Sequence, residues 1–286
     1  MDLSDATAAW RRDGFVVLPG YLHGPELKAA QRDLAGVYPS AEEYHAAPGE
    51  GRNRVYTGDE FGGIIAFPFP AVALCRVVVH DKLVALAEAF FGTEDIRIYA
   101  AELWAKYTGA ASYEQEHHRD YLNHTPLVPS TGDLRWRGLE MFIWLSDVQE
   151  DHGPTHVVPL PVTAGVPALP HGYLRSERPD FYEREQSGAG PAGTVVAYST
   201  DTFHRGTAMT APRSGRFTPT SLTGTPTTSG PAATHGGIIH STRTGSPSSS
   251  RPPCGSSCFS AFPRPATPTG PWKPSRSCES GTRAST

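Results

Sequence analysis

The spacing of apolar and polar positions changes once along the chain, near residue 95. Before that point, apolar residues recur at helical intervals, as Leu27, Ala30 and Leu34 do, and they form one stripe of an amphipathic helix. A later stripe ends at Gly92, a residue type that commonly closes helices. Helices are therefore expected over residues 4–10 (capped by Ser4), 24–39 (stopped by Pro39) and 79–91.

Beyond residue 95 the chain is strand-like. Short runs rich in Val, Ile, Phe, Tyr and Trp are separated by Gly, Pro and Asp, without helical periods between them. This order favours antiparallel sheets over a parallel sheet with crossover helices, and therefore a mainly-β fold with flanking helices, such as a sandwich or jelly roll. Strands are expected within residues 13–22, 96–107, 138–148, 153–159 and 193–200, and residues 40–68 are expected to be loop with one short strand.

The composition changes abruptly after residue 217. Roughly two-thirds of residues 218–286 are Ser, Thr, Pro or Gly, and such a composition normally builds no core. We therefore expect a domain over residues 1–217, divided into a helical N-terminal part (1–94) and a β core (95–217), followed by a low-complexity tail without packed structure.

Charge and hydropathy exclude several classes of function. The formal net charge is −4, and residues 1–217 alone carry about −9, so no basic field attracts nucleic acid or an anionic membrane. No apolar run approaches the roughly 20 residues that span a bilayer. The N-terminus is acidic and lacks the basic and apolar regions of a secretory signal, so the cytoplasm is the expected compartment.

The cysteines do not indicate a disulfide framework or a zinc site. A chain of 286 residues without a secretory signal is not a typical disulfide-stapled domain. Cys254 and Cys258 lie close together, but only Cys278 and His240 could complete a zinc site, and that spacing is irregular. Cys75 is isolated in the sequence.

The strongest chemical signal is the sequence Glu116-His-His-Arg-Asp120. In an extended strand, residues i and i+2 project from one face, so His118 and Asp120 can converge on one point while His117 points away. With a second histidine from a distant strand, they would form the two-histidine-one-carboxylate set of non-haem Fe(II) oxygenases. His204 is our choice for that histidine because it follows an apolar strand and a short polar turn. The alternatives are His124, His152, His156 and His171.

A basic residue follows His204 at a useful distance. Arg216 comes twelve residues later, where the next strand should begin, and an arginine fork can bind a dicarboxylate through two charge-assisted hydrogen bonds. Arg213 is the competitor, but it lies in a Pro-Arg-Ser-Gly turn.

Taken in order, these motifs resemble the phytanoyl-CoA dioxygenase family of Fe(II)- and 2-oxoglutarate-dependent oxygenases. The resemblance covers about residues 7–217 and rests on four segments, which are DGFVVLPGYL (13–22), His118-Arg119-Asp120, WLSDVQEDHGPTHVVP (144–159) and DTFHRGTAMTAPRSGRF (201–217). The ordered set is far more specific than any one member.

The resemblance implies a double-stranded β-helix, a relative of the jelly roll and the cupins. It also implies that His118, Asp120 and His204 bind Fe(II), and that Arg216 binds the distal carboxylate of 2-oxoglutarate. Thr155 and either Lys106 or Tyr107 are further candidates for contacts with this cosubstrate. The implied reaction uses O2, converts 2-oxoglutarate to succinate and CO2, and hydroxylates a small organic substrate of acyl, amino-acid or secondary-metabolite type. Asp120 favours hydroxylation, because halogenating relatives lack that carboxylate.

Two departures from the family pattern bear on function. Pro159-Leu-Pro-Val162 replaces the usual Pro-Gly-Ser-His beside the substrate pocket, which weakens any substrate analogy. After Phe217 the sequence continues Thr218-Pro219-Thr220, and proline cannot complete a central strand. We hypothesise a frameshift near Thr218, because another reading frame of GC-rich codons can encode an aromatic cluster and an amphipathic helix.

Two rival interpretations follow from the residues. One is a cupin-like metal enzyme that does not use 2-oxoglutarate, against which Arg216 and the order of the motifs argue. The other is a non-catalytic or defective protein that retains only the metal-binding residues.

Overall fold

A computed structural model describes residues 1–96, 98, 100–120, 138–167, 169–211 and 227–229. The chain divides into a compact unit over Met1–Arg243 and a second unit over Thr244–Thr286, which lies outside the described residues. The helices and 3₁₀ helices are α1 (Leu3–Asp13), α2 (Pro25–Val37), α3 (Ala41–Ala46), η1 (Gly51–Tyr56), α4 (Val72–Val78), α5 (Asp81–Phe91), η3 (Glu150–His152), η4 (Leu160–Val162) and α7 (Pro179–Arg184).

Two antiparallel sheets form the centre of the first unit. The strands are β1 (Phe15–Leu18), β2 (Ile65–Ala66), β3 (Glu102–Trp104), β4 (His117–His118), β5 (Leu139–Trp144), β6 (Thr155–Val157), β7 (Gly172–Tyr173), β8 (Gln186–Ser187), β9 (Val195–Ser199), β10 (His204–Gly206) and β11 (Thr227–Ser229). The larger sheet has the order β1-β9-β5-β11-β3-β2, and the smaller has the order β7-β4-β10-β6-β8. The expectation of antiparallel sheets with flanking helices is confirmed.

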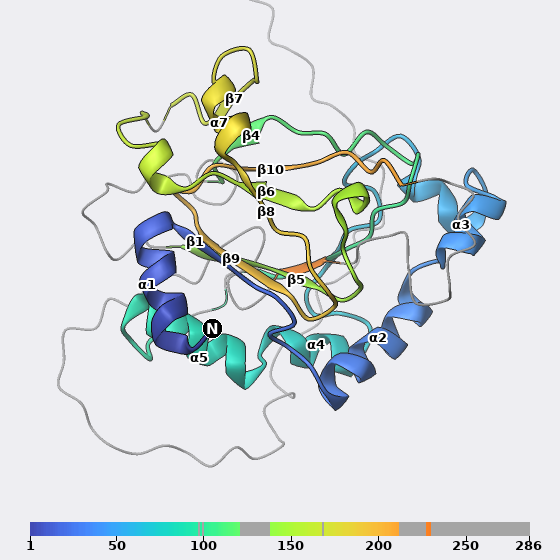
Figure 1. Cartoon of the computed structure of the whole chain (residues 1–286). Coiled ribbons are helices and arrows are strands. Elements are labelled where there is room, and N and C mark those ends of the chain that lie inside the picture. The colour runs from blue at the N-terminus through green and yellow to red at the C-terminus, as the bar shows by residue number, and fades with distance from the viewer. Residues whose placement is uncertain (97, 99, 121–137, 168, 212–226, 230–286) are drawn as a thin grey trace, which may run out of the picture. The chain divides into compact units, whose positions relative to one another are not determined.

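The larger sheet has an apolar layer on each face. Figure 1 shows α1, α2, α4 and α5 together on one side of β1, β9 and β5, with the smaller sheet on the other side. Alternate residues of β5 divide between these layers: Met141 and Ile143 join the cluster that contains the helices, whereas Phe142 and Trp144 join the cluster between the sheets. This alternation is the period of two that a strand imposes on its side chains.

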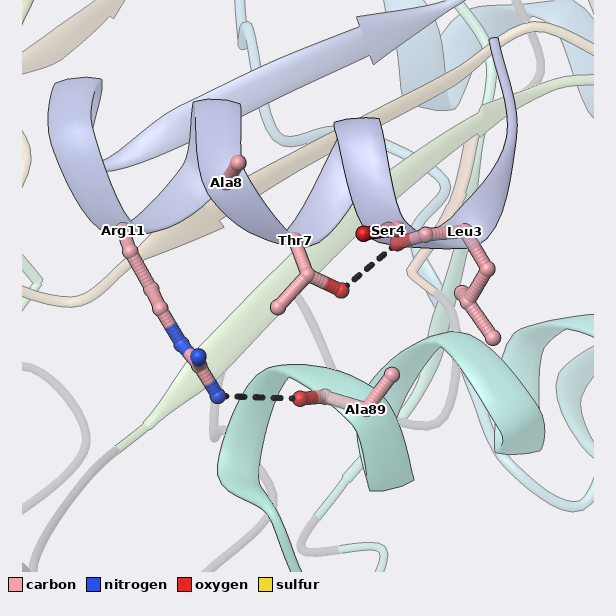
Figure 2. Close-up of a pocket in the computed structure, with 6 residues that line it drawn as sticks. All are labelled: Leu3, Ser4, Thr7, Ala8, Arg11 and Ala89. Carbon is pink, nitrogen blue, oxygen red and sulfur yellow. Dashed lines mark hydrogen bonds between the residues drawn. The ribbon is translucent and has the colours of Figure 1, made fainter.

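The helical layer is fixed by caps and by contacts between helices. Asp2, rather than the expected Ser4, caps α1, because its side chain accepts a hydrogen bond from the backbone N–H of Asp5 at 2.8 Å. Helix α1 continues to Asp13 and ends at Gly14, which takes a left-handed conformation with φ 80°. Figure 2 shows α1 beside α5, where the guanidinium of Arg11 donates to the Ala89 carbonyl across 3.4 Å.

Residues 40–68 contain more regular structure than expected. The short strand is present as β2, but α3 and η1 precede it. Ser40 caps α3 by accepting a hydrogen bond from the backbone N–H of Glu43 at 3.0 Å, and Ser-x-x-Glu is a recognised helix-start signal. Likewise α4 precedes the helix expected over 79–91, which begins at Asp81 after His80 caps it and ends at Gly92 as expected.

The strand expected over residues 96–107 is much shorter in the structure. Strand β3 covers only Glu102–Trp104, and residues 97 and 99 lie outside the described part of the chain. Its ladder ends there because β2 supplies two paired residues and β11 supplies two. The other expected strands are also confirmed as shorter elements, namely β1, β5, β6 and β9.

The tail after residue 217 departs from its expectation at one place. Thr227–Ser229 form β11, which pairs with β3 on one side and β5 on the other. These three residues are therefore paired in a sheet, and the expectation that residues 219–286 contain no packed structure otherwise stays a prediction. The remainder of the tail lies outside the described residues, and the frameshift remains a hypothesis.

Candidate metal centre

His118, Asp120 and His204 converge on one point. Each contributes a nitrogen or oxygen atom, and the three atoms lie within 4.8 Å of one another. Nε2 of His118 lies 3.8 Å from Oδ1 of Asp120, and Nε2 of His204 lies 3.2 Å from Oδ2 of the same carboxylate. One ion with bonds of about 2.1 Å can bridge donors at these separations. Asp120 and His204 are buried, whereas His118 is partly exposed.

Strand pairing brings the two imidazoles together. His118 ends β4 and His204 begins β10, and these two residues are direct partners in the antiparallel ladder. Their ring centroids are 4.5 Å apart. Residues opposite each other in a ladder place their side chains on the same face. Asp120 reaches the same point from just beyond the end of β4, two residues after His118.

Backbone carbonyls orient both imidazoles in the same way. Nδ1 of His118 lies 2.9 Å from the carbonyl oxygen of Glu116, and Nδ1 of His204 lies 3.2 Å from that of Thr202. In each ring Nδ1 is thereby the protonated donor, which leaves the lone pair of Nε2 for another partner. In both rings it is Nε2 that approaches the Asp120 carboxylate. This donor set fits a divalent metal ion.

Burial favours the metal-binding form of His204. The fully buried imidazole is poorly solvated as a cation, and His118 opposes its charge, although Asp120 favours it; the net effect lowers the pKa of His204 to about 4. The ring is therefore neutral at pH 7, as a metal ligand must be.

Tyr198, which was not among the candidate residues, supports this cluster from the larger sheet. Its hydroxyl donates to Oδ2 of Asp120 at 3.4 Å and lies 3.5 Å from Nε2 of His204. Burial, followed by the nearby charges of Asp120 and Glu140, raises the pKa of Tyr198 well above its usual value, so the phenol stays protonated. The alternation of Val196 and Tyr198 in β9 was the available signal, because both residues join the inter-sheet cluster.

His117 lies on the opposite face, as expected. Its Nε2 lies 2.7 Å from a carboxylate oxygen of Glu185, and its ring contacts Phe181 and Tyr182 edge to face. The alternative histidines lie elsewhere: His152 caps η3 through Nδ1, and His156 faces Glu150 and Glu185. The backbone carbonyl of His171 accepts from the N–H of Arg119, and His124 lies outside the described residues.

The candidates for cosubstrate contacts occupy different surroundings. Thr155 begins β6 and is buried; its register partner in β10 is Gly206, two residues beyond His204. The ammonium of Lys106 is buried, donates to the Gly153 carbonyl at 2.9 Å and lies over the rings of Trp104 and Tyr113. Burial lowers the pKa of Lys106 to about 8, against the charges of Glu60 and Glu114.

Tyr107 does not join the cluster described above. Tyr107 stacks on Tyr44 with ring centroids 4.4 Å apart, and its hydroxyl donates to the Pro39 carbonyl at 2.8 Å, so it packs in the core that contains the helices. Arg216 and its competitor Arg213 lie outside the described residues.

Figure 2 shows a groove between α1 and α5. It has a volume of about 410 Å³ and is open to solvent. Its lining is formed by Leu3, Ser4, Thr7, Ala8, Arg11 and Ala89, none of which belongs to the histidine–aspartate cluster.

None of the helices in the described part of the chain has both the length and the apolar character that a membrane span requires.

The cluster has the donor set of the two-histidine-one-carboxylate oxygenases. Residues 10–216 match the family model described as Phytanoyl-CoA dioxygenase (PhyH), and the chain belongs to this family. This membership confirms the enzyme class and the cofactors that the sequence resemblance implied: a 2-oxoglutarate-dependent oxygenase that uses iron, 2-oxoglutarate and O2. No curated protein sequence matched the chain.

Solved structures with a similar fold include two enzymes from nogalamycin biosynthesis and the protein EctD. The epimerase SnoN, solved with Fe3+, alpha ketoglutarate and nogalamycin RO, is 23% identical with a TM-score of 0.50, over 79% of this chain and 81% of that chain. The carbocyclase SnoK from nogalamycin biosynthesis is 19% identical with a TM-score of 0.54, over 79% and 81%. EctD from S. alaskensis, solved with 2-oxoglutarate and 5-hydroxyectoine, is 17% identical with a TM-score of 0.50, over 79% and 74%.

Proposed function

We propose that this chain is an Fe(II)- and 2-oxoglutarate-dependent dioxygenase that hydroxylates a small organic molecule, and that His118, Asp120 and His204 hold its iron. The observation that carries the proposal is the convergence of these three side chains within 4.8 Å, with Nε2 of both imidazoles directed to the Asp120 carboxylate. Nδ1 of each ring faces a backbone carbonyl, so no further side chain is needed to set the tautomers.

Each member of the cluster has a defined task in this proposal. The neutral imidazoles of His118 and His204 provide two lone pairs, and Asp120 provides the anionic ligand while Tyr198 donates to its Oδ2. Bound at this cluster, iron would couple the oxidative decarboxylation of 2-oxoglutarate to oxidation of the substrate by O2. The partly exposed edge of His118 is the side from which small molecules would enter.

Cosubstrate binding is proposed to use cationic and hydroxyl groups. We assign the distal carboxylate of 2-oxoglutarate to Arg216, because a guanidinium fork matches a carboxylate. Thr155, on β6 beside β10, and the buried ammonium of Lys106 are the proposed additional contacts. Tyr107 has a packing role instead, because its hydroxyl already donates to Pro39.

The core that carries this chemistry is proposed to be a double-stranded β-helix. Its support is the pair of antiparallel sheets with an aromatic layer between them, in which the smaller sheet carries His118 and His204 and the larger sheet contributes Tyr198. The polar cluster thus lies beside an apolar interior that can limit the access of water.

The substrate is proposed to be a small organic molecule of secondary-metabolite, amino-acid or acyl type. The solved relatives bind nogalamycin RO and 5-hydroxyectoine, which differ widely in chemistry, so they support the size class rather than one compound. The outcome is proposed to be hydroxylation, because the Asp120 carboxylate occupies the position that a halide would need.

The proposal is tested by measuring succinate formed from 2-oxoglutarate under air with added Fe(II), in the full-length wild type and in three variants. His118→Ala and Asp120→Ala are each expected to reduce succinate formation at least a hundredfold. His23→Ala, a change to an exposed histidine, is the matched control and should retain wild-type activity. Stoichiometric metal binding by the wild type without succinate formation above the His118→Ala level would contradict the proposal and favour a non-catalytic metal-binding protein.

A further inference from the structure

The face of the smaller sheet opposite the metal cluster carries a second set of polar side chains. His117 precedes His118 in β4, and Arg205 follows His204 in β10. Because successive side chains of a strand alternate between faces, His117 and Arg205 both lie behind the cluster. Each is buried, and each adjoins one of the two histidines that face each other in the ladder.

A single carboxylate, Glu185, joins these two residues. Oε2 of Glu185 lies 2.7 Å from Nε2 of His117 and accepts from Nε of Arg205 at 2.8 Å. Oε1 accepts from a terminal nitrogen of Arg205 at 2.8 Å, which completes a two-pronged contact. Nδ1 of His156, in β6, lies 2.9 Å from the same Oε1. The carboxylate therefore contacts three adjacent strands, β4, β10 and β6.

The negative charge of Glu185 is balanced by the positive charge of Arg205. Burial alone would raise the pKa of Glu185, but the contacts with Arg205, His117 and His156 outweigh it and hold that pKa well below the usual range. Nε2 of His117 lies within hydrogen-bond distance of this carboxylate, so the Nε2–H of its imidazole can donate to Glu185. The ion pair of Glu185 and Arg205 is buried, so its hydrogen bonds must be well aligned to offset the loss of hydration. Displacement of the strands would break these aligned hydrogen bonds and is therefore unfavourable.

We propose that Glu185 is a positioning residue that fixes the separation of His118 and His204 through His117 and Arg205, and thereby sets the metal affinity of the cluster. This inference rests on the proposed role of His118, Asp120 and His204 as metal ligands. Strand β4 has two residues and β10 has three, so their own ladder offers few hydrogen bonds. The shared carboxylate adds a second connection directly behind the two histidines.

Within the described part of the chain, Arg205 has one other carboxylate partner, Glu114. Its second terminal nitrogen donates to Glu114 at 2.6 Å, on the segment that leads into β4. Without the charge of Glu185, the guanidinium keeps, among the described residues, the ion pair with Glu114 and the contact with the ring of Tyr182, and His117 loses its anionic partner. We therefore expect the register of β4 and β10 to loosen while the remaining core, which does not include these side chains, stays folded.

The test is a Co(II) titration of the full-length apo-protein, followed by visible absorption, in the wild type, Glu185→Gln and Glu183→Gln. Glu183 is exposed and two residues away, so it is a matched control for the same change. Glu185→Gln should weaken Co(II) binding on the order of tenfold and change the shape of the ligand-field spectrum, by analogy with residues that support metal ligands. Glu183→Gln should match the wild type in both.

Thermal unfolding of the same samples separates positioning from stability alone. A lower Tm for Glu185→Gln with an unchanged Co(II) Kd and spectrum would overturn the inference. Where Glu185→Gln does not fold, Arg205→Lys replaces it: this variant keeps the charge but loses the two-pronged contact, and an unchanged Kd and spectrum would again overturn the inference. A wild type that binds no Co(II) would overturn the proposed function and this inference together, whereas equal binding by wild type and Glu185→Gln would overturn the inference alone.

Discussion

His118 and His204 face each other as register partners of β4 and β10, with ring centroids 4.5 Å apart. Two histidines that are 86 positions apart in the sequence are thus placed by the hydrogen-bond ladder, and only Asp120 depends on local spacing. A slip of one residue would turn one imidazole to the opposite face. The register of two very short strands is therefore the structural property on which the proposed metal centre depends.

Replacement of Tyr198 by Phe should weaken metal binding without unfolding the chain. The change removes the hydroxyl that donates to Asp120 and keeps the ring, which stacks on Phe142. Loss of one such hydrogen bond is worth roughly 0.5–1.5 kcal/mol, so the Kd for Co(II) should rise by about 2- to 13-fold. Titration calorimetry measures this change.

The matched control for that change is Tyr21→Phe. The Tyr21 hydroxyl also makes one hydrogen bond of 3.4 Å, to the Lys82 carbonyl, and Tyr21 is not part of the metal cluster. Its Kd should equal that of the wild type. If both variants bind Co(II) as the wild type does, the Tyr198 hydroxyl does not support Asp120.

The burial of Lys106 should make stability depend on pH in a defined window. Its pKa falls from 10.5 to about 8 in the folded chain, so between these values the unfolded chain binds more protons than the folded chain. Stability contributed by this group therefore rises with pH across that window, and the penalty for burying the charge applies fully below it. The difference between these two pKa values corresponds to a change in the free energy of unfolding of at most roughly 3 kcal/mol.

Urea unfolding of the wild type and Lys106→Met at pH 7.5 and pH 10.5 measures this dependence. The free energy of unfolding of the wild type should rise relative to that of the variant by up to about 3 kcal/mol, because the other titrating groups are common to both chains. Lys28→Met, at an exposed position, should show no such relative change. A difference between wild type and Lys106→Met that is constant with pH would contradict the burial of a charged ammonium.

Shortening the chain tests the role of β11. A chain of residues 1–217 lacks β11, which leaves β3 and β5 without the strand that pairs with both. Exposed ladder edges favour aggregation, so this chain should have a lower Tm and form soluble aggregates. A chain of residues 1–243, which keeps the whole first compact unit, should behave as the full-length protein does.

Light scattering and thermal unfolding distinguish the two shortened chains. Equal Tm values and monomeric behaviour for both would show that Thr227–Ser229 contribute nothing to the sheet. The nucleotide sequence of the gene tests the frameshift hypothesis separately, and that hypothesis fails if no other frame encodes a coherent strand and helix.

The convergence of His118, Asp120 and His204 was predictable in part from local signals. The i, i+2 spacing of His118 and Asp120 indicated that they converge, although Asp120 lies just beyond the end of β4. His204 was indicated by the apolar strand and polar turn before it, whereas its pairing with His118 depends on the ladder. Helices α2 and α5 were predictable for the same reason, since each carries its own apolar stripe. Helix caps were less predictable. At the start of α1, Asp2 and Ser4 are both good capping residues, and only the backbone geometry selects Asp2.

Features that depend on distant contacts could not be predicted in this way. Glu185 lies 68 positions from His117 and 20 from Arg205, and no spacing rule connects them. The length of β3 depends on how many residues β2 and β11 offer for pairing, although its own sequence is apolar over a longer run. Tyr107 carries a hydroxyl that suits a binding site, but the carbonyl of Pro39, 68 positions earlier, accepts its hydrogen bond.

The most direct test of the central claim is the stoichiometry of metal binding in the wild type and in three single variants. The wild type should bind one Fe(II) or Co(II) per chain under anaerobic conditions. His118→Ala, Asp120→Ala and His204→Ala should each bind at least a hundredfold more weakly, with His23→Ala as the unchanged control. Wild-type affinity in all three variants would contradict the assignment of these residues as the metal centre.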